Sequence, residues 1–470
     1  MSAPDPSLGA AISALPHPLV SALLELVGPA GVVVGADVCL RSTAGIVPEP
    51  LTARVLVRPQ SVAEVSAVLA LCHRTRTPVV THGGLTGLVH GTQAGSDDVI
   101  LSLERMNHIE EISSSQRVAM VQAGTPLQRM QEAAEAAQLF FPVDLGARGS
   151  ATIGGLLSTN AGGNRVVRYG MMRESVLGVE AVLADGTVIS SLNRVIKNNT
   201  GYDVKQLFIG AEGTLGVITR AVLRLRELPV GKPTALVALN SFDNVVGFMR
   251  HMDRNCAGLL SAFEVMWPDF YQLVTTPPAN SRPPLAHGAG FYILADALGC
   301  DAALFEQALS SALEAGLIAD ASIAQSGKEI DALWQIRDDV GQMGRFGTPF
   351  AYDISLPLED MESYASTLAE SLAKAFATSH LWLYGHLADG NLHVVVQVEG
   401  AEESAHEAVD SLVYEPLAAL RGAISAEHGI GLDKKKWLHV SRSATEIALM
   451  RSIKGALDPH GILNPGKLLP

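Results

Sequence analysis

The chain has 470 residues, a hydrophobic content of 48% and a formal net charge of −14 at pH 7. Its length predicts two or three domains, and its negative charge argues against a nucleic-acid surface and against attraction to anionic lipid. The four cysteines are scattered without CxxC spacing, which argues against a zinc knuckle, an iron–sulfur cluster or a disulfide framework. Because no stretch approaches 18 apolar residues and the first residues lack a signal-peptide pattern, we expect a cytoplasmic protein without a transmembrane segment.

The first part of the chain predicts alternating strands and helices. A short amphipathic helix near residues 17–27 precedes a strand at 54–57, a helix at 62–74 and a buried strand at 78–81. This last strand runs directly into the glycine-dense turn 82–88, whose backbone N–H groups could hold a phosphate. Taken alone, such a turn is more often structural.

Further glycine-rich segments follow at residues 144–155, 158–163 and 210–216. Glycine permits close approach of the backbone to a ligand, and a ligand that several such loops contact must be long. A dinucleotide is the natural candidate. Between these loops, an Asp-Gly pair joins two runs of strand character and predicts a β-hairpin over residues 176–190.

The region from residue 54 to residue 226 resembles the flavin-binding domain of the vanillyl-alcohol oxidase superfamily. Within it, residues 142–224 are similar to D-2-hydroxyglutarate dehydrogenases and their D-lactate and glycolate relatives. The motifs that carry the resemblance are Gly-Gly-Leu-Thr-Gly, Ile-Gly-Gly, Ser-Thr-Asn-Ala-Gly-Gly-Asn-Arg, Asn-Thr-Gly-Tyr-Asp and Asn-Pro-Gly-Lys, in this order. They imply tightly but non-covalently bound FAD, with His82 as the one side chain that leaves covalent attachment open.

The resemblance also implies which residues contact the FAD. Leu85 stands where these enzymes more often carry Asn, so one polar phosphate contact is in question, while backbone contacts should survive. The implied contacts lie in the glycine loops and beside them: His82, Gly83, Gly84, Leu85, Thr86, Gly87, Leu88, Pro142, Asp144, Gly146, Ala147, Gly154, Gly155, Ser158, Thr159, Asn160, Gly163, Gly213, Gly216, Val217, Ile218 and Asn464.

After about residue 230 the glycine loops end, and amphipathic helices alternate with short strands. We expect helices at 241–255, 301–315 and 360–378, and strands at 290–295 and 349–356. An antiparallel sheet covered on one face by helices is the economical architecture, and it agrees with the cap domain of the resembling enzymes. The expected fold is therefore α+β: a two-subdomain FAD-binding domain (1–229), a substrate or cap domain (230–426), and a C-terminal segment (427–470) that returns to the FAD-binding domain.

The segment His386-Leu-Ala-Asp-Gly-Asn-Leu-His393 combines a turn with two side chains that can bind metal. If Asp389 and Gly390 form a two-residue hairpin loop, His386 lies directly opposite His393. Opposed strand residues have Cβ atoms about 4.5 to 5.5 Å apart, which suits two imidazoles on one zinc ion. A register slip of one residue would separate them. Two ordinary strand histidines with satisfied hydrogen bonds are the alternative.

Glu427 and His428 follow a long alanine-rich stretch that predicts a helix, and glycines at 429 and 431 end it. Adjacent residues at a helix end can point in different directions. Glu427 could therefore complete a metal site of two histidines and one carboxylate, while His428 faces a substrate. A surface Glu-His pair at a helix end is the alternative.

The resemblance implies oxidation of a D-2-hydroxy acid to the 2-oxo acid, with hydride transfer to flavin N5. A divalent metal, by default zinc, on His386, His393 and Glu427 would bind the substrate hydroxyl and lower its pKa. Neutral His428 would then remove the hydroxyl proton as the general base, and Asn391 would help to orient the site. The matching residues have these roles in the resembling dehydrogenases.

Arg337, in Leu-Trp-Gln-Ile-Arg, is the candidate for a bidentate clamp on the substrate carboxylate. The alternative is a solvent-facing arginine paired with Asp338 or Asp339. D-2-hydroxyglutarate dehydrogenases carry a Lys and a Thr where this chain has Ala351 and Gly341. The resemblance therefore favours a shorter acid such as D-lactate, with D-2-hydroxyglutarate as the second candidate. The expected substrate contacts are Arg337, Tyr352, His386 and His428.

Two other classes of protein remain open. One is a flavin oxidase that delivers electrons to oxygen, against which the carboxylate clamp and the metal ligands argue. The other is a flavoprotein without catalytic activity, in which those ligands would hold no metal. A dehydrogenase also needs an electron acceptor, which could be an electron-transfer flavoprotein, a quinone or a cytochrome. We further expect a homodimer.

Overall fold

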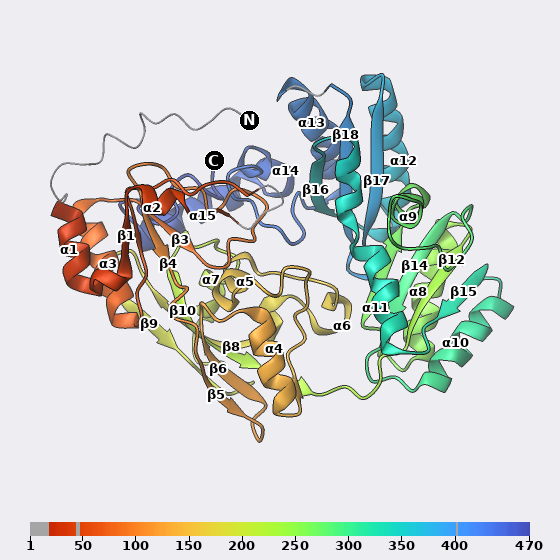
Figure 1. Ribbon diagram of the computed structural model, residues 1–470, viewed down its shortest axis with the longest axis horizontal. Helices are drawn as coiled ribbons and strands as arrows, with labels where there is room; N and C mark the ends of the chain where they lie inside the picture. The colour runs from red at the N-terminus through yellow and green to blue at the C-terminus, as the bar shows by residue number, and fades with distance from the viewer. Residues whose placement is uncertain (1–17, 44–47, 401–402) are drawn as a thin grey trace.

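The computed structural model describes residues 18–43, 48–400 and 403–470. Figure 1 shows two lobes side by side, which we call the first lobe (red to yellow) and the second lobe (green to light blue). The dark blue C-terminal segment crosses back over the first lobe (Figure 1). Within the described ranges, no helix has both the length and the apolar character needed to cross a membrane. Residue 17 and the N-terminal residues used for the signal-peptide argument lie outside these ranges.

The smaller sheet of the first lobe has four strands in the order β1-β2-β4-β3. β2, β4 and β3 are parallel, and β1 is antiparallel to β2. Val55, Val57 and Val99 are fully buried because α1 and α3 pack on this face. The elements are α1 (Pro18–Val27), β1 (Val32–Val34), α2 (Ala36–Cys39), β2 (Val55–Val57), α3 (Val62–Thr75), β3 (Val79–His82) and β4 (Val99–Ser102).

The larger sheet of the first lobe is antiparallel, with the strand order β5-β6-β10-β8-β9. The β8–β9 hairpin confirms the hairpin predicted over residues 176–190. The elements are β5 (Ile109–Ser113), β6 (Val118–Gln122), α4 (Leu127–Ala136), β7 (Leu139–Phe140), α5 (Ile153–Thr159), α6 (Val166–Tyr169), β8 (Val176–Val182), β9 (Val188–Ser191), α7 (Lys205–Phe208), β10 (Val217–Arg224) and β11 (Arg226–Glu227).

The second lobe is built on one antiparallel sheet of seven strands, in the order β15-β12-β14-β13-β17-β18-β16. The strands are β12 (Thr234–Leu239), β13 (Ala262–Met266), β14 (Phe291–Asp296), β15 (Asp320–Ile323), β16 (Phe350–Ser355), β17 (Ser379–His386) and β18 (Asn391–Val398). The expectation of a helical layer on only one face is wrong, because two separate apolar clusters lie on the two faces. The face that carries α9 and α11 also carries the candidate site.

The helices of the second lobe begin where their sequences provide N-caps. The side chain of Ser241 accepts a hydrogen bond from the N–H of Asn244, and that of Asp301 accepts from Ala303 and Leu304. The helices expected at 241–255, 301–315 and 360–378 are confirmed. The helices are α8 (Phe242–Asn255), α9 (Pro268–Thr275), α10 (Ala302–Glu314), α11 (Gly327–Asp338), α12 (Leu358–Ala375) and α13 (Glu403–Leu420), with a 3₁₀ helix η3 (Val340–Phe346) after α11.

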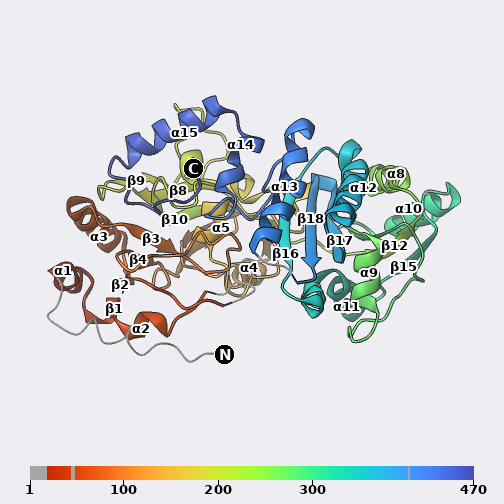
Figure 2. The same cartoon turned by 90° about the horizontal axis from the view of Figure 1, so that it is seen from above.

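The C-terminal segment makes contacts with the first lobe. It contains α14 (Leu438–Ser441), which packs against α13, and α15 (Ala444–Leu457), which lies over β8 to β10 in Figure 2. Leu463 forms a parallel bridge with Val79. Asn464 accepts a hydrogen bond from the N–H of Thr81 at 2.9 Å and donates to the carbonyl of Glu212 at 2.6 Å. One side chain therefore ties the end of the chain to two glycine-rich segments.

Candidate functional site

The predicted hairpin that carries the histidines is formed by β17 and β18, but its loop is longer than two residues. A short 3₁₀ helix and Gly390, with φ 81°, form the loop. His393 lies opposite Tyr384, so the expected direct opposition of His386 and His393 is wrong. The shift amounts to two residues. Because strand side chains alternate with a period of two, both imidazoles still face the same side of the sheet.

The structure brings the three predicted metal ligands together. Nε2 of His386 lies 3.6 Å from Oε2 of Glu427, and the ring centres of His386 and His393 are 5.3 Å apart. One possible ligand atom from each residue lies within 4.8 Å of the others. Two buried imidazoles and one carboxylate form a donor set typical of catalytic divalent metals with open coordination positions. The residues therefore fit such an ion, and metal binding stays a prediction.

Asp353, His393 and His428 form a second compact set of possible ligand atoms. The carboxylate of Asp353 is already occupied, however. Its Oδ2 accepts hydrogen bonds from the N–H groups of Glu427 at 2.8 Å and His428 at 2.9 Å, and from Ala426 at 3.1 Å. An oxygen that already accepts three amide hydrogen bonds has little lone-pair capacity left for binding a metal. The set with Glu427 is therefore the better candidate.

Asp353 also explains why Glu427 and His428 point into the site. We expected these two residues at a helix end, and this is wrong. α13 stops at Leu420, and an irregular turn follows. Asp353 projects from β16 and holds three successive backbone amides of that turn. Burial opposes the charge of Asp353, but the nearby side chains of His428 and Lys434 and the hydrogen bond from the Glu427 amide outweigh it, so the pKa of Asp353 falls far below its usual value.

A second carboxylate, on the half-buried Glu212, holds the next part of the same turn from the first lobe. Oε1 of Glu212 accepts from the N–H of Ile430 at 2.7 Å, and Oε2 accepts from Gly431 at 2.8 Å. Glu427 itself accepts a hydrogen bond from the backbone N–H of Gly163, also in the first lobe. The turn that carries Glu427 and His428 is therefore fixed by both lobes.

Glu264 organises the opposite side of the site. It lies in β13, opposite His386, and its Oε1 accepts from Nδ1 of His386 at 2.8 Å. Its Oε2 accepts from Nε of Arg337 at 2.8 Å. A carboxylate on one imidazole nitrogen fixes the tautomer and directs the other nitrogen to a metal. A charged residue in the apolar strand Ala-Phe-Glu-Val-Met was the available sequence signal, and the sequence analysis missed it.

The protonation of the ligands also fits a cation. Burial opposes the charge of His386, but Glu264 and Glu427 outweigh it and raise the pKa of His386 well above its ordinary value. Burial likewise opposes the Glu427 carboxylate, yet His386 lowers the pKa of Glu427 to about 2. Burial, His386 and Arg337 lower the pKa of His393 to about 3, which leaves a neutral imidazole. Between the two carboxylates the site favours positive charge, which either a proton or a metal ion supplies.

Arg337 lies in this site and not in solvent. It is buried at the end of α11, and its Nη2 lies 3.4 Å from Nε2 of His386. Its guanidinium stacks over the Tyr384 ring at 5.1 Å. Asp338 approaches Nη1 only to 3.7 Å. Glu264 binds the Nε side of the guanidinium. Nη2 is therefore the nitrogen that lies next to the candidate metal ligand His386.

Of two other predicted site residues, Asn391 lies in the site and Tyr352 does not. Asn391 donates to Oδ1 of Asp353 and to the carbonyl of Ile354, both at 2.9 Å. Tyr352 is on the other face of the sheet, where its hydroxyl donates to Asp410 at 2.8 Å. The expected substrate contact of Tyr352 is therefore wrong, because alternation along β16 directs Asp353 and not Tyr352 toward the site.

The predicted FAD contacts come from loops that meet in the first lobe. Gly84 approaches Ser150 so closely that a Cβ would lie 2.0 Å from the Ser150 carbonyl oxygen, and Gly163 approaches Asp144 in the same way. Gly87 and Gly146 instead border open space, where a cofactor can reach the backbone. These loops therefore provide both tight packing and accessible backbone, which fits FAD.

Two side chains of the first glycine loop have specific environments. His82 is buried, with Nε2 2.8 Å from the carbonyl oxygen of Thr92, so this nitrogen is engaged in packing. Leu85 adopts a left-handed conformation with φ 59°, which Asn adopts more readily than Leu. The individual FAD contacts stay predictions.

Comparison with known proteins agrees with the fold and with FAD binding. Residues 53–191 match the FAD binding domain family, and residues 228–468 match the C-terminal domain of FAD linked oxidases. The chain is 39% identical over 424 residues to a mitochondrial D-2-hydroxyglutarate dehydrogenase of Bos taurus, covering 89% of this chain and 77% of the relative. It is 38% identical to a D-2-hydroxyglutarate dehydrogenase of Xanthomonas citri, covering 90% and 89%.

A solved structure supports the fold at a greater evolutionary distance. The crystal structure of p-cresol methylhydroxylase with substrate bound has a TM-score of 0.75 and 16% identity, and covers 96% of both chains. The two family matches define a class of flavoproteins that join an FAD binding domain to the C-terminal domain of FAD linked oxidases. Within it, this chain belongs to the FAD-dependent D-2-hydroxyacid dehydrogenases.

Proposed function

We propose that the chain oxidises a D-2-hydroxy acid at the site formed by His386, His393, Glu427, Arg337 and His428. The observation that carries the proposal is the convergence of two imidazoles and a carboxylate within 4.8 Å, beside a buried arginine. When bound, FAD supplies a hydride acceptor, and a divalent metal, by default zinc, supplies a Lewis acid that lowers the pKa of the substrate hydroxyl. A flavin oxidase and a non-catalytic flavoprotein would need neither the clamp nor the ligands.

Arg337 binds and orients the substrate carboxylate in this proposal. Glu264 fixes the guanidinium through Nε, which leaves Nη1 and Nη2 for a carboxylate. A preorganised fork loses little entropy when it binds, and it sets the direction of the acid as well as its position. The substrate hydroxyl then lies on the side of His386, whose Nε2 is 3.4 Å from Arg337 Nη2.

His428 removes the hydroxyl proton. Its backbone is held by Asp353, while its side chain keeps 25% of its surface exposed and is accessible to a substrate. Nδ1 of His428 lies 3.9 Å from the Asp353 carboxylate, which stabilises the imidazolium formed when Nε2 accepts a proton. The ring lies 6.0 Å from that of His393, so the base is next to the metal ligands.

The environment of Ala351 favours a short acid such as D-lactate. Ala351 lies two residues before Asp353 and therefore faces the same side of the sheet. It pairs with Val395, which pairs with Trp382, so this row next to the site is apolar where the resembling diacid enzymes carry a Lys. A distal carboxylate would find no charged partner in this row.

D-2-hydroxyglutarate is the second candidate, and one observation favours it. Phe346 lies 5.3 Å from the Trp382 ring, and the guanidinium of Arg345 stacks on Phe346 at 5.8 Å. Arg345 therefore approaches the same row from η3, and the two relatives compared above bear the name of this substrate. A change of rotamer would suffice to bring its charge toward a distal carboxylate.

A panel of D- and L-2-hydroxy acids, assayed by dye reduction on the FAD-loaded protein, tests the proposal. We expect turnover of D-acids only, with kcat/KM for D-lactate above that for D-2-hydroxyglutarate. Turnover of L-acids or of none would overturn the proposed reaction. A preference for the diacid would leave the reaction intact and assign the distal charge to Arg345.

We also propose the wider setting of this reaction. In this proposal FAD is held non-covalently, because His82 is buried and its Nε2 is hydrogen-bonded to the carbonyl oxygen of Thr92. The chain divides at about residues 229 and 426, which follow β11 and α13. A homodimer in the cytoplasm, with an electron-transfer flavoprotein, a quinone or a cytochrome as the acceptor, completes the proposal.

A further inference from the structure

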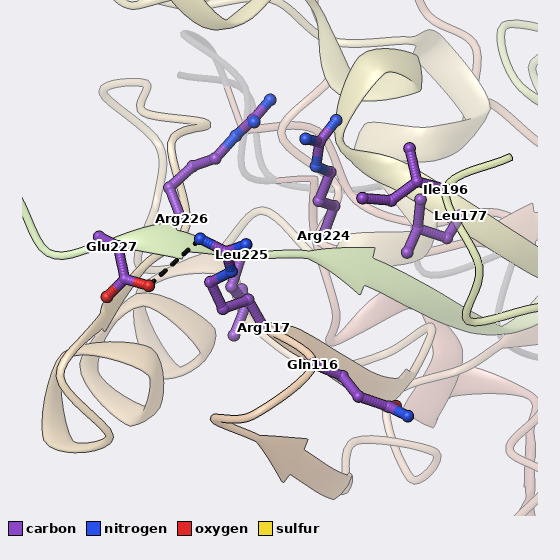
Figure 3. Close-up of a pocket in the computed structure, with 8 residues that line it drawn as sticks. All are labelled: Gln116, Arg117, Leu177, Ile196, Arg224, Leu225, Arg226 and Glu227. Carbon is purple, nitrogen blue, oxygen red and sulfur yellow. Dashed lines mark hydrogen bonds and ion pairs between the residues drawn. The ribbon is translucent and has the colours of Figure 1, made fainter.

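A small pocket lies on the first lobe, where the chain leaves the larger sheet toward the second lobe. Figure 3 shows three arginine side chains around it, Arg117, Arg224 and Arg226, together with Gln116, Ile196 and Glu227. It is separate from the residues described above. We call it the arginine pocket.

The backbone enforces this clustering of positive charge. Arg224 ends β10 and Arg226 begins β11, and Leu225 between them is only 2% exposed. Because alternate residues of an extended chain face the same side, the buried Leu225 directs both arginines away from the core. The N–H of Leu225 donates to the carbonyl of Arg117 at 2.8 Å, which brings the β5–β6 turn alongside.

Few negative or hydrogen-bond-accepting groups of the protein balance the positive charges of these guanidinium groups. Arg117 pairs with Glu227 at 3.3 Å, but both side chains are more than half exposed, and such pairs contribute little. Among the described residues, Arg224 has neither a hydrogen bond nor an ion pair from its side chain, and the buried Nε of Arg226 has no partner. Burial and then Arg224 lower the pKa of Arg226, so like charges repel here.

A fourth arginine adds to the positive charge. Arg168 stacks on Tyr169 at 5.0 Å and donates to the carbonyls of Leu259 and Leu298, so the groups that hold it are neutral. It also acts on Arg226 as a like charge. This corner of the molecule therefore carries a local excess of positive charge, although the chain as a whole has a net charge of −14.

We propose that the arginine pocket binds a small oxyanion, of the phosphate or carboxylate type. Guanidinium forks bind such groups through paired charge-assisted hydrogen bonds. An anion between Arg224 and Arg226 would remove their repulsion and satisfy donors that the protein leaves unpaired. It would also tie the β5–β6 turn to the strand that continues into the second lobe, and so stabilise the folded chain.

Thermal unfolding of the FAD-loaded protein tests this site, because bound FAD already fills its own phosphate-binding loops. Inorganic phosphate should raise the Tm saturably by roughly 1 to 3 °C. Potassium chloride at matched ionic strength should not, since screening alone lacks the fork geometry. Acetate in place of phosphate distinguishes a carboxylate site from a phosphate site.

Arg224→Ala and Arg226→Ala should lose the response to phosphate or acetate. Without added anion at low salt, both variants should melt at or above the wild-type Tm, because a like-charge contact is removed. Arg74→Ala, an exposed arginine on α3, is the matched control and should keep the response. An equal anion response in all variants, or an equal response to chloride, would overturn the proposal. Variants that melt lower without anion would show that these arginines are structural.

Discussion

Oε1 of Glu264 accepts a hydrogen bond from Nδ1 of His386 at 2.8 Å, inside the sheet of the second lobe. The same carboxylate holds Arg337 through its other oxygen. One buried side chain therefore positions both a candidate metal ligand and the candidate carboxylate clamp. It acts on two functions without contacting substrate in the proposed arrangement.

Glu264→Gln should weaken metal binding about 10- to 100-fold, as is usual when such a carboxylate is lost from a histidine ligand. In the variant, the amide NH2 would face an N–H donor of either His386 or Arg337. Because two donors cannot form a hydrogen bond, that side chain would no longer be held in its orientation. The measurement is metal retained against graded chelator, with FAD absorbance as a check on folding. Glu362→Gln, on exposed α12 surface, is the control. Unchanged metal affinity would show that Glu264 serves packing alone.

His393→Ala should remove both the metal and the turnover, with FAD retained. The neutral His393 imidazole is one of three ligands, and two ligands bind a divalent ion weakly. Elemental analysis should find about one divalent ion per wild-type chain, and chelation should abolish turnover until the metal is restored. A variant that keeps both its metal and its rate contradicts the ligand assignment.

His428→Ala should leave the metal in place and reduce kcat by roughly 10² to 10⁴, the usual contribution of a positioned general base. The backbone N–H of residue 428 still donates to Asp353, so the turn should persist. Metal content and FAD absorbance serve as the internal controls. If the metal is lost as well, His428 acts through the structure of the turn and not as a base.

Glu212→Gln should lower kcat about 10- to 100-fold, because small displacements of catalytic groups are costly. Only one oxygen would remain to accept the N–H groups of Ile430 and Gly431, so the turn carrying His428 must shift. KM and Tm should change little by comparison. A fall in Tm with kcat unchanged would limit Glu212 to stability.

Ala351→Lys should move the substrate preference toward D-2-hydroxyglutarate. A charge-assisted hydrogen bond contributes roughly 1.5 to 3 kcal/mol, which corresponds to about 10- to 150-fold in kcat/KM for the diacid. D-lactate should be little affected. Arg345→Ala is the informative companion, since a loss confined to the diacid would show that Arg345 already supplies the distal charge.

Much of the fold was accessible from the sequence because its signals are local. Ser241 and Asp301 mark helix starts, and the Asp-Gly pair at 185–186 marks a hairpin, since capping and turn chemistry need only neighbouring residues. The glycine-rich motifs similarly indicated FAD through their own order. His386, His393 and Glu427 were identified because metal-capable residue types beside glycine turns are visible in the sequence.

The register and the supporting residues needed the tertiary structure. The four-residue loop shifted His386 and His393 by two positions, and the pair survived only because a strand has a period of two. Tyr352 was misplaced because its neighbour Asp353 takes the face of the site.

Glu212 and Asp353 gave no local signal for their roles, and the charged Glu264 in an apolar strand gave no sign of which residues it would hold. The partners of Glu212, Glu264 and Asp353 lie 218, 122 and 74 residues away in the chain, so only the assembled sheet of the second lobe and the packing of the 426–431 turn against both lobes bring them together. The sequence by itself determined which groups can do the chemistry. The tertiary structure decided which carboxylates orient those groups. Hydrogen bonds between residues this far apart in the chain form only when the whole core is in place.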